Sequence, residues 1–337
     1  MKNTMSNISA SQFAALLLIP DTFAVLSLRK GVSMVTAAAF LIATMIQLVL
    51  AIPVTKLSKG KITVGGSAKV VQIIYFAYII LWGGILFGML RSVSDILSVP
   101  TNYLPFIPEK LLISGLIAIV CIYASSGGFR ILSRAAIIAA ALGAVSITVI
   151  IIGALPVMSA ENLGKSLSEG IFSEIIRGIS LSGGMGTFVV LLSHYEGNPL
   201  KSAYGYLGAR AVVWTAIILT TAASAGGIMR FTDFPVAAAA EISQPFASQR
   251  IDSLFLMMMA VLAVFSVSVQ TAAAAELIHG IIPSFDKFRG IVCVTLMILV
   301  SALVVPDMYN IAIAAAVVFV LFIVPLIMNL TGRRRSR

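Results

Sequence analysis

Apolar residues run along the chain in long stretches that carry no charge, rather than in the short alternating runs of a sheet protein. About 20 apolar residues suffice for one membrane-spanning helix. Ten stretches approach or exceed this length; the first contains Asp21, the sixth contains Glu174 and Arg177 near its start, and the other eight contain no charge. They cover residues 9–28, 32–54, 70–90, 111–129, 135–156, 171–193, 211–229, 253–275, 290–306 and 308–330. The pattern predicts an all-α integral membrane protein with ten transmembrane helices.

Composition and charge agree with a lipid environment. The mean hydropathy is +1.05, 59% of residues are hydrophobic and 11% are charged, whereas soluble domains carry about 25% charged residues. Most of the 23 Lys and Arg residues fall on one side if both termini are cytoplasmic, as the positive-inside rule requires. We therefore interpret the net charge of +10 as a topology signal and expect no nucleic-acid partner. The alternative is a basic tail, residues 332–337, that recruits a cytosolic protein.

The ten spans divide into two sets of five. Residues 1–160 form the first predicted repeat, and residues 161–337 form the second together with the basic cytoplasmic tail. The two repeats belong to one membrane domain. Because each repeat has an odd number of spans, the two would lie in opposite orientations, as inverted repeats do.

The first span of each repeat contains residues that disfavour a helix. Pro20 and Asp21 lie in the first span, and Gly183, Gly184 and Gly186 lie in the sixth, within SLSGGMGT. Each glycine costs about 1 kcal/mol relative to alanine inside a helix. Interrupted helices at matching positions of inverted repeats indicate a transporter binding site. The alternative is that the glycines only allow helices to pack closely.

The predicted break at Pro20–Asp21 suggests how a ligand could be held. A carboxylate within a membrane is costly and so indicates function: Asp21 could bind a ligand ammonium or a coupling proton. Backbone amides of Thr22, Phe23 and Ala24, at the start of a half-helix, could bind a ligand carboxylate. Together these groups predict a zwitterion, a small amino acid. Alternatively, Asp21 or Thr22 caps the half-helix.

Further candidate ligand-binding residues lie in the third, sixth and eighth spans. They are Ser180, Ser182 and Thr187 beside the glycines, an aromatic stripe of Tyr75, Tyr78 and Trp82, and Ser268 and Gln270 in the eighth span. The stripe could equally be packing. Ser268 and Thr271 share a helix face and could bind sodium, although such hydroxyls often bond carbonyls of their own helix. We expect no enzyme, metal site or cofactor, because no catalytic or metal-binding spacing is present.

Two segments resemble a known family. NISASQFAALLLIPDTFAVLSL, from Asn7, contains the Ile-Ser-x-x-Gln element of endospore germination permeases at Ile8, Ser9 and Gln12. The segment 249–278 is similar to the eighth helix of these proteins, which enters through a basic-apolar-acidic element, here 250–252. The family comprises the B subunits of germinant receptors, in the amino acid–polyamine–organocation superfamily.

This resemblance implies a leucine-transporter-like fold of five plus five helices and a location in the inner membrane of the spore. It also implies binding of a small amino acid or amine and association with companion germinant-receptor subunits. On this interpretation the protein senses a nutrient and signals germination. A proton-coupled amino-acid or amine permease, or a membrane scaffold with a relict pocket, remains an alternative.

Overall fold

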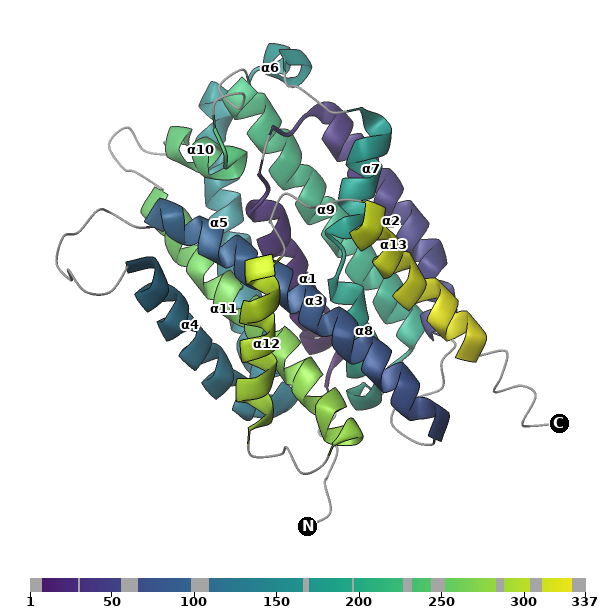
Figure 1. The fold of residues 1–337 in the computed structure, drawn as a ribbon. Coiled ribbons are helices and arrows are strands. Elements are labelled where there is room, and N and C mark those ends of the chain that lie inside the picture. The colour runs from purple at the N-terminus through teal and green to yellow at the C-terminus, as the bar shows by residue number, and fades with distance from the viewer. Residues whose placement is uncertain are drawn as a thin grey trace.

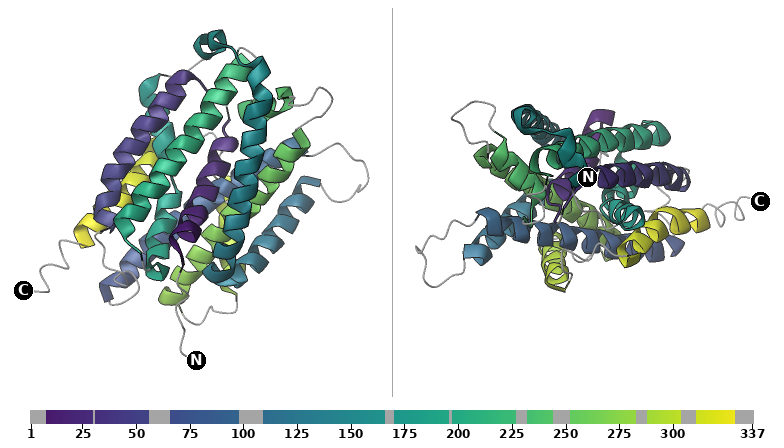
Figure 2. Two further views of the ribbon diagram at one scale, coloured as in Figure 1. Left: turned by 180° about the vertical axis from the view of Figure 1, so that it is seen from behind. Right: turned by 90° about the horizontal axis from the view of Figure 1, so that it is seen from above.

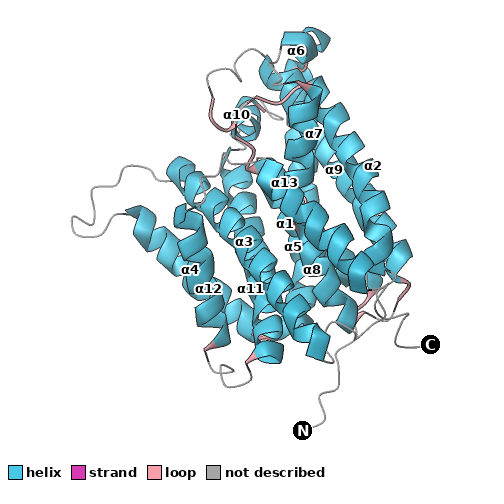
Figure 3. Cartoon of the chain, turned by 45° about the vertical axis from the view of Figure 1, so that its right-hand side comes forward, coloured by secondary structure: helices cyan, strands magenta, loops and turns pink. Residues whose placement is uncertain are grey.

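The computed structural model describes most of the chain as helices packed side by side (Figure 1). The residues described are 8–29, 31–55, 66–97, 109–165, 170–195, 197–226, 232–243, 252–282, 288–303 and 311–328. The basic tail at 332–337 and two residues of the resemblance, Arg250 and Ile251, lie outside these ranges. Within the described residues strand pairing is limited to an isolated bridge between Ile8 and Tyr195, and Figure 3 draws the chain as helices and loops.

The helices follow one another along the chain with short connections among the described parts. In chain order they are α1 (Ala10–Leu26), α2 (Met34–Thr55), α3 (Gly66–Leu97), α4 (Glu109–Ser126), α5 (Gly128–Ala154), α6 (Ala160–Lys165), α7 (Ile171–Ser180), α8 (Gly184–Leu191), α9 (Pro199–Ala225), α10 (Pro235–Ile242), α11 (Asp252–Ile281), α12 (Arg289–Leu303) and α13 (Ile311–Val318). Short 3₁₀ turns follow α5 and α8 at Leu155–Val157 and Leu192–His194, and a π-helical turn, Phe319–Ile323, follows α13.

Local sequence signals explain where the helices begin. Ser9 caps α1: the Gln12 amide donates to Ser9 Oγ (3.4 Å), and the Gln12 side chain accepts from the Ser9 amide (3.0 Å). The Ile8 amide donates to the His194 carbonyl (3.0 Å), which connects the start of α1 to the 3₁₀ turn that follows α8. The Ile-Ser-x-x-Gln element therefore has a structural role as the start of this helix.

Burial separates central helices from peripheral ones. Every residue of α8 is buried, as is every residue of α1 from Ile19 onward. The apolar segment 171–194 contains α7 and α8, and 83% of its most apolar 18 residues are buried. The corresponding fraction for segment 128–157, which contains α5, is 28%. The exposed faces of α2, α4 and α5 carry large apolar side chains such as Met45, Ile119 and Leu142. These faces suit contact with lipid, and the central helices carry the buried polar residues.

Helix α1 packs against α5, α8, α9 and α11, and α8 packs against α1, α3 and α11 in the middle of the bundle (Figures 1 and 2). Helix α2 packs along α7 and α9, and α11 packs along α3 and α5. The short helices α6 and α10 lie toward one end of the molecule: α6 lies beyond the top of α9 in Figure 1, and α10 lies beside the upper part of α9. This arrangement brings side chains from α1, α2, α3, α9 and α11 toward the junction between α7 and α8.

Candidate functional site

The helix predicted to break at its glycines is interrupted there. Helix α7 ends at Ser180, residues 181–183 are not α-helical, and α8 begins at Gly184. Hydrogen bonds of Ser182 close the end of α7: its hydroxyl donates to the Gly178 carbonyl (2.8 Å) and its amide to the Ile179 carbonyl (3.2 Å). The predicted interruption within SLSGGMGT is confirmed.

The predicted break at Pro20–Asp21 is wrong. Helix α1 continues through both residues to Leu26, and the non-helical chain begins only at Ser27. Pro20 removes one helical N–H, but neighbouring helices can compensate a lost bond inside a membrane bundle. The Trp214 indole N–H donates to the Asp21 carbonyl (3.0 Å) and supports this part of the helix.

The continuous helix also changes the expected role of the amides that follow Pro20. Thr22, Phe23 and Ala24 lie in the last two turns of α1, twelve or more residues after its start and before its end at Leu26. Amides in a helix interior bond to carbonyls of the preceding turn, so they differ from the exposed amides of a helix N-terminus. The idea that these three amides bind a ligand carboxylate therefore loses its geometric basis.

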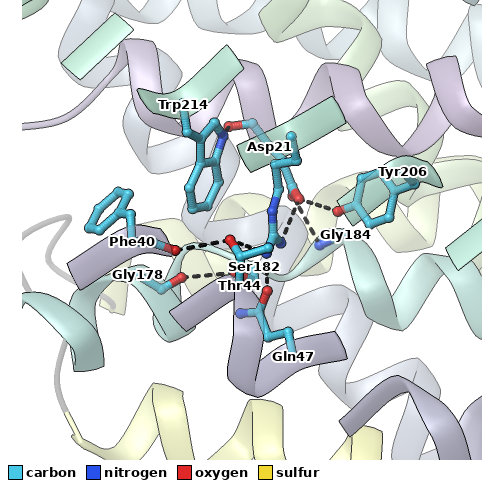
Figure 4. Close-up of polar contacts among 10 residues, drawn as sticks. Asp21, Phe40, Thr44, Gln47, Gly178, Ser182, Gly184, Tyr206 and Trp214 are labelled. Carbon is cyan, nitrogen blue, oxygen red and sulfur yellow. Dashed lines mark hydrogen bonds and ion pairs between the residues drawn. The ribbon is translucent and has the colours of Figure 1, made fainter. Parts of the chain in front are cut away.

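Asp21 is fully buried and its carboxylate accepts from three donors (Figure 4). Arg210 Nη1 lies 3.2 Å from Oδ2, and the Tyr206 hydroxyl donates to the same oxygen. The Gly184 amide donates to Oδ1 (3.3 Å). Asp21 thus caps the N-terminus of α8 from a different helix, whereas the alternative drawn from the sequence was that Asp21 or Thr22 caps the half-helix that follows it.

Arg210 is held from two other sides. Its Nη2 donates to Thr44 Oγ1 (3.3 Å) and to Gln47 Oε1, both on α2. The Trp214 ring centroid lies 4.6 Å from the guanidinium carbon, within range of a cation–π contact. Buried ion pairs persist where further hydrogen bonds compensate the lost hydration. We call Asp21, Thr44, Gln47, Tyr206, Arg210 and Trp214 the Asp21 cluster.

The predicted span 211–229 leaves Arg210 just outside the apolar stretch, at a membrane border, but Arg210 is fully buried within α9. The charge-free run begins at residue 211, whereas the helix begins at Pro199, where the Asn198 side chain accepts from the amides of Leu200 and Lys201. The missed signal was spacing: residues 206, 210 and 214 repeat at intervals of four, which places them on one helix face. Glu174 on α7 is a second buried acidic residue, 3.5 Å from Arg177.

A second polar group, from α3 and α11, contacts the start of α8. The aromatic rings of Trp82 and Tyr78 lie so close to Gly183 and Gly186, respectively, that a methyl group on either glycine would overlap them. The glycines therefore permit close packing, as the alternative interpretation proposed, at the same place where the helix is interrupted.

Gln270 of α11 reaches the same turn of α8, where its Oε1 accepts from the Thr187 hydroxyl (2.7 Å). Among the residues that the structure describes, three polar atoms of this group are buried without a hydrogen-bond partner: Tyr78 OH, Trp82 Nε1 and Gln270 Nε2. The side chains are 5%, 2% and 0% exposed, respectively. We call Tyr78, Trp82 and Gln270 the donor group. Buried donors without partners are rare in native structures and call for an explanation.

The remaining predicted side chains satisfy one another or their own helices. The hydroxyls of Ser180 and Ser268 donate to the carbonyls of Ile176 (2.8 Å) and Val264 (2.6 Å), and that of Thr271 to the Val267 carbonyl (2.8 Å). Tyr75, the first residue of the aromatic stripe, donates to the Val320 carbonyl (3.0 Å) in the π-helical turn. These residues lie near the site, but their hydroxyls are already engaged.

Apolar helices fit the predicted spans. Seven described segments are long and apolar enough to cross a membrane: 34–55, 69–92, 128–157, 171–194, 199–225, 254–281 and 311–328. Three shorter apolar helices cover 10–26, 114–126 and 289–303. Each of the ten stretches predicted from the sequence overlaps one of these segments.

Comparison with solved structures finds the fold of a transporter. The chain is similar to Mhp1, a transporter of the nucleobase-cation-symport-1 family, in a closed conformation with bromovinylhydantoin bound. The TM-score is 0.59, and the match covers 92% of this chain and 76% of Mhp1 at 14% sequence identity. No protein-family profile and no curated protein sequence matches the chain. The protein is therefore a multi-pass membrane protein with the all-helical fold of a membrane transporter.

Proposed function

We propose that this protein is a membrane transporter that binds a small polar solute at the interruption between α7 and α8. The observation that carries the proposal is the donor group: three buried polar atoms without partners lie against the first residues of α8. A bound solute would supply the missing hydrogen bonds. The class of solute expected from the sequence, a small amino acid or related nutrient, is retained here.

The location of the donor group supports transport as well as binding. A helix interrupted within a membrane exposes backbone groups only where they line a ligand site or are buried in protein. Transporter folds place substrates near such half-helices. Here α8 contacts α1, α3 and α11, so a solute at this turn would touch several helices whose relative positions can change.

The finer topology belongs to the same proposal. We infer ten spans in two inverted repeats, 1–160 and 161–337, with both termini in the cytoplasm. The overlap of the ten predicted stretches with apolar helices supports the count, and the Lys and Arg distribution supports the orientation.

Uptake by reconstituted protein tests the proposal. The purified protein is placed in liposomes, and entry of radiolabelled amino acids and nucleobases is followed over time. We expect saturable uptake of at least one solute. The Gly183→Ala variant should lose most of it, because the added methyl group displaces the Trp82 ring. Gly205→Ala is the matched control, because a methyl group on Gly205 meets no atom within 4 Å. Absence of uptake for every solute would contradict transport.

A second candidate, a germinant-receptor subunit that binds its nutrient without moving it, is favoured by the resemblance at Ile8, Ser9 and Gln12. This candidate predicts that the nutrient binds to the protein but is not taken up. It also predicts that genes for companion receptor subunits lie beside the gene for this protein. Isothermal calorimetry in nanodiscs beside the liposome assay separates the two candidates: binding with saturable uptake supports the transporter, and binding alone supports the receptor.

A further inference from the structure

Resting on the proposed function, we propose that the donor group holds the solute through hydrogen-bond acceptors, carboxylate or carbonyl oxygens, and that the solute needs no ammonium bound to Asp21. This differs from the expectation drawn from the sequence, in which Asp21 receives the ammonium of an amino acid. The argument rests on which polar atoms of the two groups already have partners.

The Asp21 carboxylate is occupied. One oxygen faces Arg210 and the Tyr206 hydroxyl, and the other faces the Gly184 amide. An added ammonium would have to share this carboxylate with a guanidinium a hydrogen bond away, and like charges at such a distance repel strongly in a buried site. Arg210 cannot yield its place without breaking its bonds to Thr44 and Gln47 on α2.

The donor group offers the opposite chemistry. The Trp82 indole N–H and the Gln270 amide nitrogen can only donate. The Gln270 oxygen accepts from the Thr187 hydroxyl, and the amide nitrogen is the atom of that side chain without a partner. The Tyr78 hydroxyl can donate as well. Solute oxygens would satisfy all three atoms, whereas a solute ammonium, which only donates, would leave the nitrogens of Trp82 and Gln270 without partners.

Charge points to the same class of solute. Asp21 and Arg210 compensate each other, and the donor group carries no charge. The first turn of α8, which the donor group contacts, has the partial positive charge of a helix N-terminus and favours acceptor atoms. The unpartnered nitrogens at the edge of the Asp21 cluster, Arg210 Nε and Gln47 Nε2, are donors too.

Sets of matched compounds test the proposal by calorimetry and thermal unfolding in nanodiscs. For alanine, leucine and phenylalanine, the amino acid is compared with its 2-hydroxy acid, which keeps the carboxylate, and with the decarboxylated amine. Uracil, which offers carbonyl oxygens without charge, separates a carbonyl solute from a carboxylate. We expect binding by 2-hydroxy acids, uracil or both, and none by the amines.

Variants locate the binding to the donor group. Tyr78→Phe, Trp82→Phe and Gln270→Leu should each weaken binding by about tenfold, since each removes one hydrogen bond to a solute oxygen. Tyr75→Phe is the control on the same helix, because its hydroxyl bonds to Val320, and affinity should not change. Thermal unfolding of every variant shows whether it is folded.

The outcomes separate the two proposals. If an amine binds as tightly as its amino acid while the 2-hydroxy acid and uracil do not bind, the inference is wrong and the proposed function stands. The same holds if a compound binds but the three variants leave its affinity unchanged. If no compound binds or enters liposomes, the proposed function is overturned, and the inference with it.

Discussion

Two buried polar groups contact the start of α8, and they differ in how their polar atoms are paired. In the Asp21 cluster, opposite charges face each other and the carboxylate accepts from three donors. In the donor group, uncharged side chains present polar atoms without partners. Similar residue types occur in both: Tyr206 and Trp214 have partners where Tyr78 and Trp82 have none.

This difference suggests that the two groups have different roles at the start of α8, one structural and one in binding a solute. A compensated ion pair between α1 and α9 fixes the position of α8 through the Gly184 amide. Polar atoms without partners contribute nothing to the folded protein alone and cost their lost hydration. They are explained if a solute pairs with them. The comparison therefore predicts that removing a polar atom destabilises the protein in one group and weakens binding in the other.

The largest effect is expected from Arg210→Met. The variant leaves the Asp21 carboxylate buried without a counter-ion, and breaking a buried pair costs about 3–5 kcal/mol of unfolding free energy. The measurement is thermal or denaturant unfolding in detergent. Arg134→Met, at an exposed position, is the control. The double variant Asp21→Asn/Arg210→Met should recover part of the loss. Equal stability of Arg210→Met and the wild type would show that the pair does not hold the fold.

A smaller difference is expected between two tyrosines. Tyr206→Phe removes a donor from a buried carboxylate and should cost about 1.5–3 kcal/mol of unfolding free energy. Tyr78→Phe removes a hydroxyl that has no partner and should leave stability unchanged or slightly increased. Both are measured by unfolding without solute. If Tyr78→Phe were the more destabilising change, the assignment of the two groups would be reversed.

The sequence could predict the broken helix and several of the residues that lie near the start of α8, because these depend on local chemistry. Glycines at 183, 184 and 186 disfavour a helix, and Tyr78 and Trp82 lie on one face of their helix because they are four residues apart. Thr187 and Gln270 were both candidates, and the structure brings them together. The ligand-binding role assigned to these residues stays a prediction.

The sequence could not predict the Asp21 cluster, because that cluster depends on tertiary contacts. Pro20 suggested a broken helix, but contacts from other helices, including the bond from Trp214, support an unbroken one. Arg210 suggested a membrane border, because a charge normally ends an apolar run. Only the packing of α1 against α9 shows that its charge is compensated by Asp21.

The smallest difference is expected between two tryptophans, and it tests whether a hydrogen bond alone distinguishes the groups. Trp214→Phe keeps an aromatic ring but removes the N–H that donates to the Asp21 carbonyl, and should cost about 1 kcal/mol of unfolding free energy. Trp82→Phe removes an N–H without a partner and should not lower stability in the absence of solute. Both substitutions remove similar ring volume, so packing losses largely cancel in the comparison. A difference near zero would mean that the unpartnered indole of Trp82 is no different from the bonded one of Trp214, and the donor group would lose its basis as a binding site.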